Sequence, residues 1–234
     1  MKVKTPANNF IIDGNVGAGK TSVMKELDKI FANLKEKYAD EDMPELNIIE
    51  EPLELWVSGP MGNILSEQRR LPTIHSFITQ AYIMGTMTTK VRIPSDVEGK
   101  KCANVLERSI FSSNAFIEMF RDDLYITDTE YKCLQQLLKA LTTDEDITGY
   151  IYIDVEPEVV FERVKARDGD ECPDLDYFRK LDEKYKSVVK RICKDEPADV
   201  LVVDGTLDSE ELAEVVAGWI FARCNERQRT VLTF

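Results

Sequence analysis

The hydrophobic residues of the chain follow two alternating patterns. Short apolar runs predict strands buried on both faces, at residues 9–13, 46–50, 102–107, 150–155 and 199–205. Between these runs, apolar residues return with helical periodicity and predict helices at 20–38, 73–92, 108–122, 129–141, 157–167, 174–194 and 208–224. Strands that alternate with helices indicate an α/β fold, here a five-stranded parallel sheet with helices on both faces.

The size of the chain suits this architecture. Its 234 residues, 43% of them hydrophobic, are enough for a full core in one domain of moderate size. The sequence has no linker-like tract, no low-complexity segment and no internal repeat. We therefore expect a single domain over residues 1–234.

The charge balance is strongly acidic. The chain has 43 Asp and Glu residues against 30 Lys and Arg residues, a formal net charge of −13. Such a surface repels nucleic acids and anionic membranes, so neither is an expected partner. A phosphate-binding site in this chain must depend on local cations and on a metal ion.

Cysteine and histidine usage disfavours several kinds of site. The five cysteines are widely spaced, odd in number and form no CxxC pair, which indicates free thiols in a reducing compartment. The only histidine is His75, so a histidine-rich metal site and a Ser-His-Asp hydrolase are both poorly supported. No apolar run approaches the roughly 20 residues of a membrane helix, and few residues precede the first predicted strand. We expect a cytoplasmic protein.

A glycine-rich motif joins the first predicted strand to the first predicted helix. It matches G-x-x-x-x-G-K-[ST], whose backbone N–H groups form a ring around a phosphate at a helix N-terminus. The lysine would reach the β- and γ-phosphates of a nucleoside triphosphate, and the threonine hydroxyl would bind Mg²⁺. The alternative is a plain glycine-rich turn. The residues of this phosphate loop are Gly14, Asn15, Val16, Gly17, Ala18, Gly19, Lys20, Thr21 and Ser22.

The next strand ends in a pair of acids, Glu50 and Glu51, with Trp56 a little further on. A carboxylate at the carboxyl end of a parallel strand points into the crevice where ligands bind, so Glu51 could take a proton from an attacking hydroxyl. Trp56 offers a flat face for a base. The alternative is that Glu51 caps a helix that begins near Pro52.

The third predicted strand ends in Glu107 and Arg108. Glu107 would lie beside the phosphate loop and orient a metal ion, and Arg108 would neutralise charge on the moving phosphoryl group. The alternative is a simple ion pair on the surface. No N-K-x-D guanine signature accompanies these motifs, and a single small domain does not suit a motor ATPase.

Taken together, these motifs resemble the deoxynucleoside kinase family, which includes insect deoxynucleoside kinase, mitochondrial thymidine kinase, deoxycytidine kinase and, more distantly, herpesvirus thymidine kinases. Five segments of this chain occur in the order and spacing that is typical of the family: GNVGAGKTS, EEPLELW, TQAYIMGTM, ERSIFS and ERVKARDGDE. The resemblance extends from about residue 10 to 190. It implies a three-layer P-loop NTP-binding fold, ATP as phosphate donor, Mg²⁺ and a homodimer.

The resemblance assigns roles to the site residues. Glu51 matches the general base, Arg108 the arginine that positions the 5′-hydroxyl and the γ-phosphoryl group, and Glu107 the acid that orients the Mg²⁺ shell together with Thr21. Gln80 matches the glutamine that reads the base edge, and Trp56 and Phe116 match the aromatic side chains around the base.

The surroundings of Gln80 support a base pocket. Ile83, Met84 and Met87 share its helical stripe, and a buried amide among apolar residues needs a partner. Taken alone, a hydrogen bond to backbone in a plain core is the simpler explanation. Relatives that prefer deoxycytidine and purine nucleosides have an arginine and an aspartate where this chain has Met87 and Ser113. The pocket therefore resembles the thymidine-accepting type, and an amide can also pair with deoxycytidine.

A lid is expected near 163–173. Arg163 matches a lid arginine that faces the phosphates and Arg167 one that stacks on adenine, but Gly169 stands where the family has a third arginine. Glu171 or Asp170 matches the acid for the sugar 3′-hydroxyl, whereas the family's tyrosine for the same hydroxyl is missing from residues 65–69. The alternative is an ordinary solvated helix end.

These features favour transfer of a γ-phosphoryl group from ATP to a deoxynucleoside, with thymidine as the first choice. A thymidylate kinase shares the fold, but its anionic acceptor needs cations rather than a carboxylate at the acceptor oxygen. A non-catalytic relative is the remaining alternative. The helices at 73–92 and 108–122 could pair in a dimer or belong to the core of one chain.

Overall fold

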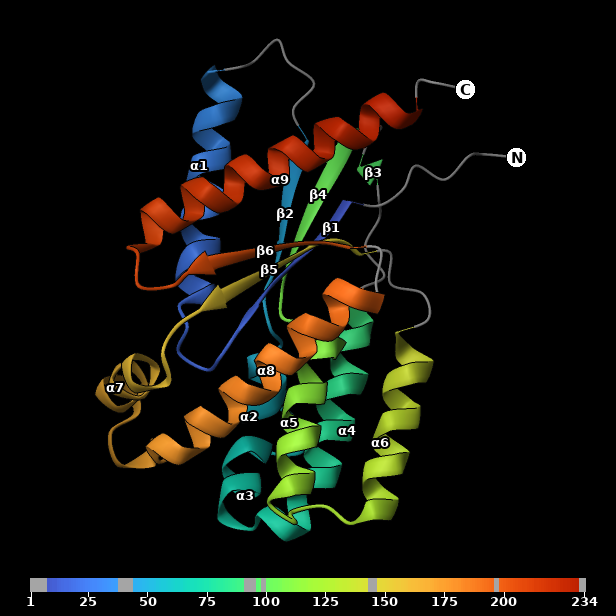
Figure 1. Ribbon diagram of the computed structural model, residues 1–234, viewed down its shortest axis with the longest axis vertical. Helices are drawn as coiled ribbons and strands as arrows, with labels where there is room; N and C mark the ends of the chain where they lie inside the picture. The colour runs from blue at the N-terminus through green and yellow to red at the C-terminus, as the bar shows by residue number, and fades with distance from the viewer. Residues whose placement is uncertain are drawn as a thin grey trace.

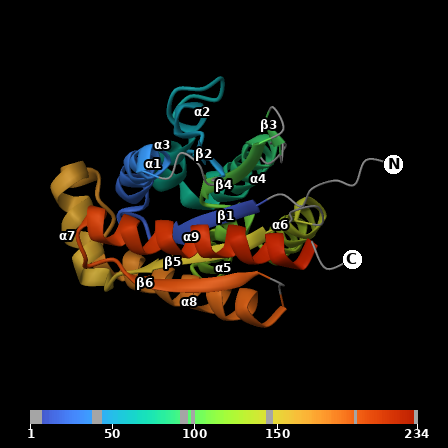
Figure 2. The same cartoon turned by 90° about the horizontal axis from the view of Figure 1, so that it is seen from above.

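The sheet forms the centre of the molecule. The computed structural model describes residues 8–37, 44–90, 96–97, 100–142, 147–195 and 198–231. Within them, parallel strands follow one another in the order β2-β4-β1-β5-β6 (Figure 2), and a short β3 pairs antiparallel with β4. This confirms the predicted five-stranded parallel sheet. The strands are β1 Asn8–Gly14, β2 Glu45–Ile49, β3 Asp96–Val97, β4 Lys100–Glu107, β5 Ile147–Asp154 and β6 Asp199–Asp204.

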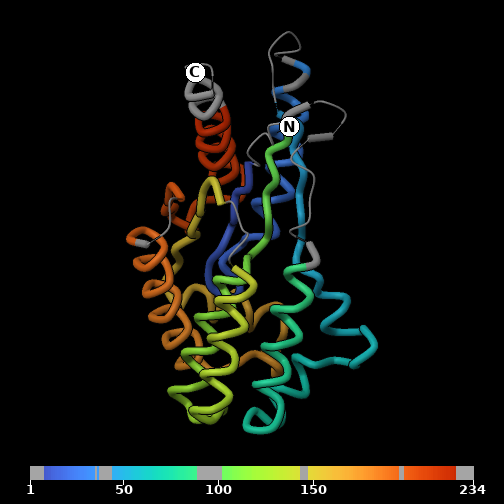
Figure 3. The backbone as a smooth tube through the Cα atoms, turned by 90° about the vertical axis from the view of Figure 1, so that its right-hand side faces the viewer, coloured from blue at the N-terminus to red at the C-terminus, as the bar shows by residue number. Residues whose placement is uncertain are grey.

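Helices cover both faces of the sheet (Figure 1). The helices α1 and α9 pack on one face, and α4, α5, α6 and α8 pack on the other. On this second face α4, α5 and α6 lie side by side (Figure 3). The helices are α1 Lys20–Lys37, α2 Leu53–Val57, α3 Ile64–Arg70, α4 Pro72–Lys90, α5 Ile110–Asp122, α6 Asp128–Leu141, α7 Pro157–Asp168, the 3₁₀ turn η1 Gly169–Glu171, α8 Leu175–Asp195 and α9 Ser209–Val231.

The side chains of β1 divide the core into two halves. Phe10 and Ile12 are buried against α1 and α9, and Ile11 is buried among the helices of the opposite face. This alternation follows from the period of two along a strand, and it explains why all three central residues of the strand, Phe10, Ile11 and Ile12, are apolar. Among the described residues, none of the helices is both long and apolar enough to cross a membrane.

Gly149 allows the sheet and α9 to approach each other closely. A Cβ atom at this position would lie 2.4 Å from the ring of Trp219, which also packs edge-on against Phe10 with ring centroids 6.0 Å apart. The strand β5 begins at Ile147, three residues before the predicted start, because Thr148 and Gly149 are buried with the rest of the strand.

Two short helices follow β2. A helix near Pro52 was predicted only as one that Glu51 could cap; α2 does begin at Leu53, but its N-cap is Pro52 and no side chain caps it. The helix α3 was not predicted, since seven residues are too few for a clear period; Asn63 starts it by accepting a hydrogen bond from the backbone N–H of Ser66. Residue 38 and residues 91–92, at the ends of two predicted helices, lie outside the described residues.

The apolar residues of α5 belong largely to the core of the chain, whereas α4 exposes some of its own. In α5, Ala115, Ile117 and Phe120 are buried against neighbouring elements. In α4, Met84 is buried, but Ile74 and Ile78 are 64% and 44% exposed. The intramolecular alternative therefore describes α5, and α4 keeps an outer apolar face.

Leu124 ends α5 in a left-handed conformation that suits glycine. Its φ is +57°, and the hydrogen bonds Leu124 N–H to Arg121 O (3.0 Å) and Tyr125 N–H to Phe120 O (2.8 Å) form a Schellman motif. The leucine side chain is 81% exposed and offers little packing to compensate for this backbone strain.

We predict that Leu124→Gly stabilises the protein by about 1 kcal/mol, because glycine removes the steric cost of the positive φ. Leu124→Ala retains a Cβ atom and should leave stability nearly unchanged. Urea unfolding followed by circular dichroism measures both; equal midpoints for the glycine and alanine variants would contradict the prediction.

Candidate active site

A cleft of about 1460 Å³ opens at the carboxyl ends of the strands. This is the location expected for a ligand site in a parallel sheet. Most of the candidate residues line it, although they come from distant parts of the sequence. They are Val16, Gly17, Ala18, Gly19, Lys20, Thr21, Ser22, Glu51, Trp56, Gln80, Ile83, Met87, Glu107, Arg108, Ser113, Phe116, Arg163, Arg167 and Glu171.

Gly14 and Asn15 do not line the cleft but support the loop from behind. The carbonyl groups of both accept hydrogen bonds from Lys20 Nζ, at 3.1 and 2.8 Å. The Asn15 side chain donates to Phe178 O at 3.1 Å and accepts from Val16 N–H at 2.8 Å. These bonds tie the phosphate loop to its own lysine and to α8.

Gly17 is required by both the conformation and the packing of this loop. Its φ is +84°, and a Cβ atom there would lie 2.6 Å from Val164 Cγ2 in α7. A larger residue would therefore strain the backbone and push α7 away.

Lys20 is buried at the base of the cleft, with 6% of the residue exposed. Burial and the nearby Arg108 guanidinium lower its pKa from 10.5 to about 8, although Glu51, Asp13 and Glu107 act in the opposite direction. An anion placed in the ring of N–H groups would restore the charged form of the lysine, because opposite charge favours ionisation.

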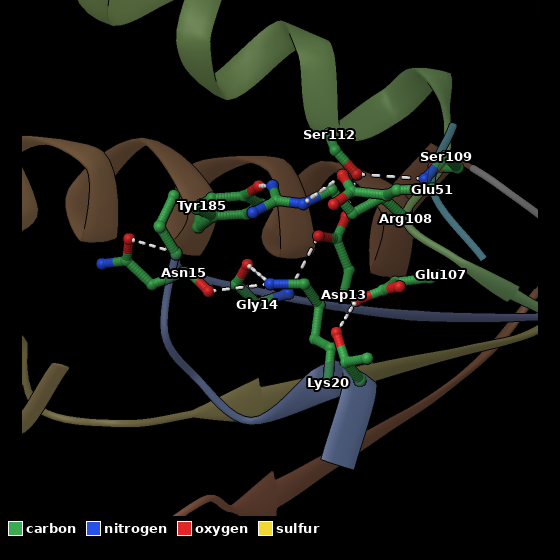
Figure 4. Close-up of polar contacts among 12 residues, drawn as sticks. Asp13, Gly14, Asn15, Lys20, Glu51, Glu107, Arg108, Ser109, Ser112 and Tyr185 are labelled. Carbon is green, nitrogen blue, oxygen red and sulfur yellow. Dashed lines mark hydrogen bonds and ion pairs between the residues drawn. The ribbon is translucent and has the colours of Figure 1, made fainter. Parts of the chain in front are cut away.

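Glu51 and Arg108 form an ion pair that faces the phosphate loop, with 2.7 Å between Glu51 Oε1 and Arg108 Nε. Figure 4 shows these side chains gathered between β1 and the helices α5 and α8. Arg108 also donates to the hydroxyl of Tyr185, and its guanidinium lies 5.5 Å from the ring centroid of Phe116. Burial raises the pKa of Glu51, and Arg108 and Lys20 reduce this rise.

Thr21 and Glu107 place hard oxygen ligands at the mouth of the phosphate loop. The Thr21 hydroxyl donates to Glu107 Oε1 at 2.6 Å. A hydroxyl and a carboxylate fit Mg²⁺, which prefers oxygen ligands and usually takes most of its shell from phosphates and water. The described residues contain no cluster of three acidic, cysteine or histidine side chains that could hold a metal ion.

The amide of Gln80 lies in the cleft beside the apolar side chains of Trp56, Ile83 and Met87. Gln80 is 3% exposed, and its Oε1 has no hydrogen-bond partner within the described part of the chain. Trp56 donates from Nε1 to Thr86 Oγ1 at 2.9 Å and packs with Met87. A buried oxygen without a partner is costly and would be satisfied by an N–H group of a ligand.

The segment 163–173, for which a lid was predicted, also lines the cleft where α7 turns into η1. Arg163 Nη2 donates to Gly205 O at 3.0 Å, and Arg167 bonds Asp168 at 2.6 and 2.8 Å. The Arg167 hydrogen bond lowers the pKa of Asp168. Glu171 faces Arg69 of α3 across the mouth of the cleft, with 3.8 Å between Oε2 and Nη2.

Sequence reasoning missed the side chains that support this site. Asp13 lies within an apolar run and was taken only as part of a strand, and Tyr185 lies within a plain amphipathic helix. Arg69 also lines the cleft, from the helix that was not predicted. An acid directly before the first glycine of a phosphate loop is the one signal that could have directed attention to Asp13.

This combination of fold and site defines a phosphotransferase with the P-loop kinase fold. The family model for deoxynucleoside kinases matches residues 10–221, and the chain belongs to the deoxynucleoside kinase family.

Individual relatives differ in their substrates. The chain is 25% identical to a thymidine kinase of Ictalurid herpesvirus 1 (strain Auburn) over 96% of this chain and 90% of the relative. It is 23% identical to a deoxyadenosine kinase of Dictyostelium discoideum, over 92% of this chain and 80% of the relative. A deoxyadenosine kinase from M. mycoides with bound dCTP shares the fold, with a TM-score of 0.71, 19% identity and coverage of 91% of this chain and 98% of that one.

The lowered pKa of Lys20 leads to a prediction about nucleotide binding. Near pH 9, where most of the Lys20 population is neutral in the empty site, binding of Mg-ATP should take up about half a proton or more; near pH 7 the lysine should contribute almost none. Calorimetric titrations in two buffers of different ionisation enthalpy measure this uptake. Lys20→Arg, which stays charged, should show no proton uptake at pH 9. Equal uptake by the wild type and the variant would contradict the assignment of the uptake to Lys20.

Proposed function

We propose that this chain is an ATP- and Mg²⁺-dependent deoxynucleoside kinase that phosphorylates the 5′-hydroxyl of thymidine and, as a second acceptor, deoxycytidine. The observation that carries the proposal is the buried Glu51–Arg108 pair, at 2.7 Å, in the same cleft as the phosphate loop. A carboxylate next to the transfer site suits a neutral hydroxyl acceptor, which must lose a proton, better than an acceptor that is already anionic.

On the donor side, the phosphate loop and Lys20 bind the triphosphate of ATP. Thr21 and Glu107 hold Mg²⁺, which when bound screens the negative charge of the phosphates. Arg163 turns from Gly205 O to the phosphates when the donor is present, and Arg167 stacks on adenine. These two residues form the lid near 163–173 of a single kinase domain over 1–234.

On the acceptor side, Glu51 takes the proton of the 5′-hydroxyl as the oxygen attacks the γ-phosphorus. The raised pKa of Glu51 brings its proton affinity closer to neutral pH and makes it a better base than an exposed glutamate. Arg108 places a fixed positive charge next to the phosphoryl group during its transfer. Most of the rate enhancement then comes from positioning and charge stabilisation.

The base occupies the part of the cleft that Gln80 lines. The unpartnered Oε1 of Gln80 accepts from an N–H group of the base, which thymine and cytosine both offer. Trp56 and Phe116 contact the faces of the ring, and Ile83, Met87 and Ser113 leave room beside it for the 5-methyl group of thymine. Glu171 accepts from the sugar 3′-hydroxyl at the mouth of the cleft.

We also propose that the active form is a homodimer that buries the outer apolar face of α4. The exposed side chains of Ile74 and Ile78, one helical turn apart, support this proposal. Light scattering during gel filtration gives the mass in solution.

An assay with Mg-ATP and single acceptors tests the substrate. We predict turnover of thymidine first and deoxycytidine second, with little for deoxyadenosine or deoxyguanosine, because a larger purine meets Met87 and Phe116. Monophosphate formation is followed by chromatography. A purine preference would keep the enzyme class and refute the pocket assignment, and turnover of dTMP alone would refute the role of Glu51.

A second prediction concerns the general base, Glu51. Glu51→Gln should lower kcat by about 100-fold or more, the usual contribution of a general base, and change ATP affinity by no more than about twofold. Glu50→Gln removes the charge of an exposed neighbour and should leave kcat unchanged. Steady-state kinetics and ATP titrations provide both values; similar kcat values for the two variants would exclude Glu51 as the base.

A further inference from the structure

The backbone of Arg108 is fixed in an unusual conformation. Its φ is +58°, and only one other non-glycine residue in the described ranges, Leu124, has a positive φ. The Arg108 N–H donates to Ile12 O of β1 at 2.9 Å, and the next residue, Ser109, caps α5. Costly conformations of this kind persist where the surroundings hold them, and they concentrate at functional sites.

The side chain of Arg108 has two anchors on different elements (Figure 4). Its Nε faces Glu51 at the end of β2, at 2.7 Å, and its Nη1 donates to the hydroxyl of Tyr185 in α8. The guanidinium also lies 5.8 Å from the centroid of the Tyr185 ring. The two anchors engage different edges of the planar group and together set its orientation.

Tyr185 is well suited to act as a fixed anchor. It has no exposed surface and does not line the cleft, so it cannot touch a substrate. Its ring contacts Phe116 and Tyr152, each with ring centroids 6.2 Å apart. A buried hydroxyl needs a hydrogen-bond partner, and the guanidinium of Arg108 provides one.

The two anchors differ in one important respect. When Glu51 takes a proton it loses its charge, and its ion pair with Arg108 weakens at the moment when the arginine has to face the phosphoryl group. The Tyr185 hydroxyl does not titrate in the working range, because burial raises its pKa. It therefore holds Arg108 equally well before and after proton transfer.

We propose that Tyr185 is a positioning residue of the phosphoryl transfer, which keeps the Arg108 guanidinium between Glu51 and the phosphate loop throughout the reaction. This inference rests on the proposed function. Tyr185 acts through Arg108 and makes no contact with the substrate.

The pH dependence gives a readout that a purely structural role would not change. Four charged groups act on Glu51: Arg108 and Lys20 favour its carboxylate form, and Glu107 and Asp13 disfavour it. Of these four groups, only Arg108 loses a hydrogen-bond partner when the Tyr185 hydroxyl is removed. The carboxylate of Glu51 then becomes less stabilised, and the acidic limb of the kcat/KM profile moves to higher pH.

The test compares Tyr185→Phe with Tyr152→Phe. Each substitution deletes one hydroxyl from a buried ring of the same cluster, but the Tyr152 hydroxyl donates to Asp182 at 3.5 Å and not to the site. The measurements are kcat, both KM values and the pH profile with the deoxynucleoside that the wild type uses best, together with ATP affinity and thermal melting as controls for folding.

We expect Tyr185→Phe to lower kcat by about tenfold and to shift the acidic limb upward by roughly half a pH unit, with KM for ATP within about twofold of the wild type. Tyr152→Phe should match the wild type in all of these values. Wild-type kcat and pH profile in Tyr185→Phe, or the same losses in Tyr152→Phe, would overturn the inference and leave the proposed function intact. A wild type that phosphorylates none of the deoxynucleosides would overturn the proposed function itself.

Discussion

The buried carboxylate of Asp13 connects the phosphate loop, the sheet and α5, and the site depends on the relative positions of these elements. The residue has no exposed surface, and a carboxylate so placed must be fully hydrogen bonded. Its Oδ1 accepts from Gly14 N–H at 2.8 Å, and its Oδ2 accepts from the hydroxyls of Tyr150, at 2.5 Å, and Ser112. One side chain of the central strand β1 therefore joins the phosphate loop, the neighbouring strand β5 and the first turn of α5, which begins two residues after Arg108.

The electrostatics of the cleft follow from this arrangement. An acidic chain cannot attract a triphosphate with its overall field, so it concentrates a few cations where water is scarce. Lys20 and Arg108 are both buried there, and Glu51, Glu107 and Asp13 surround them. Burial disfavours the charged form of each group, so it lowers the pKa of Lys20 and raises that of Glu51, and the neighbouring opposite charges reduce both shifts.

The sequence was sufficient for everything that depends on local pattern. The parallel strands and most helices follow from apolar periodicity, and Glu51 could be placed near Arg108 because both follow strands of one parallel sheet. What was missed depends on long-range contacts or lies in elements too short to show a period. Nothing near Tyr185 indicates that it bonds an arginine 77 residues earlier, and seven residues of α3 carry too little periodicity to predict the position of Arg69 in the cleft.

In the proposed function, the choice of nucleobase depends on only a few residues of the site. The backbone frame, the phosphate loop and the acid–arginine pair treat every deoxynucleoside alike, which fits a family whose similar members include both a thymidine kinase and a deoxyadenosine kinase. Under this proposal, discrimination is left to one buried amide, Gln80, and to the volume that Met87 and Ser113 leave beside it. A site that hydrogen bonds its substrate rejects an analogue without the matching group far more strongly than an apolar pocket rejects an analogue that lacks one methylene group. In the proposed function, the Gln80 amide therefore selects the hydrogen-bonding edge of the base, and Met87 and Phe116 limit its size.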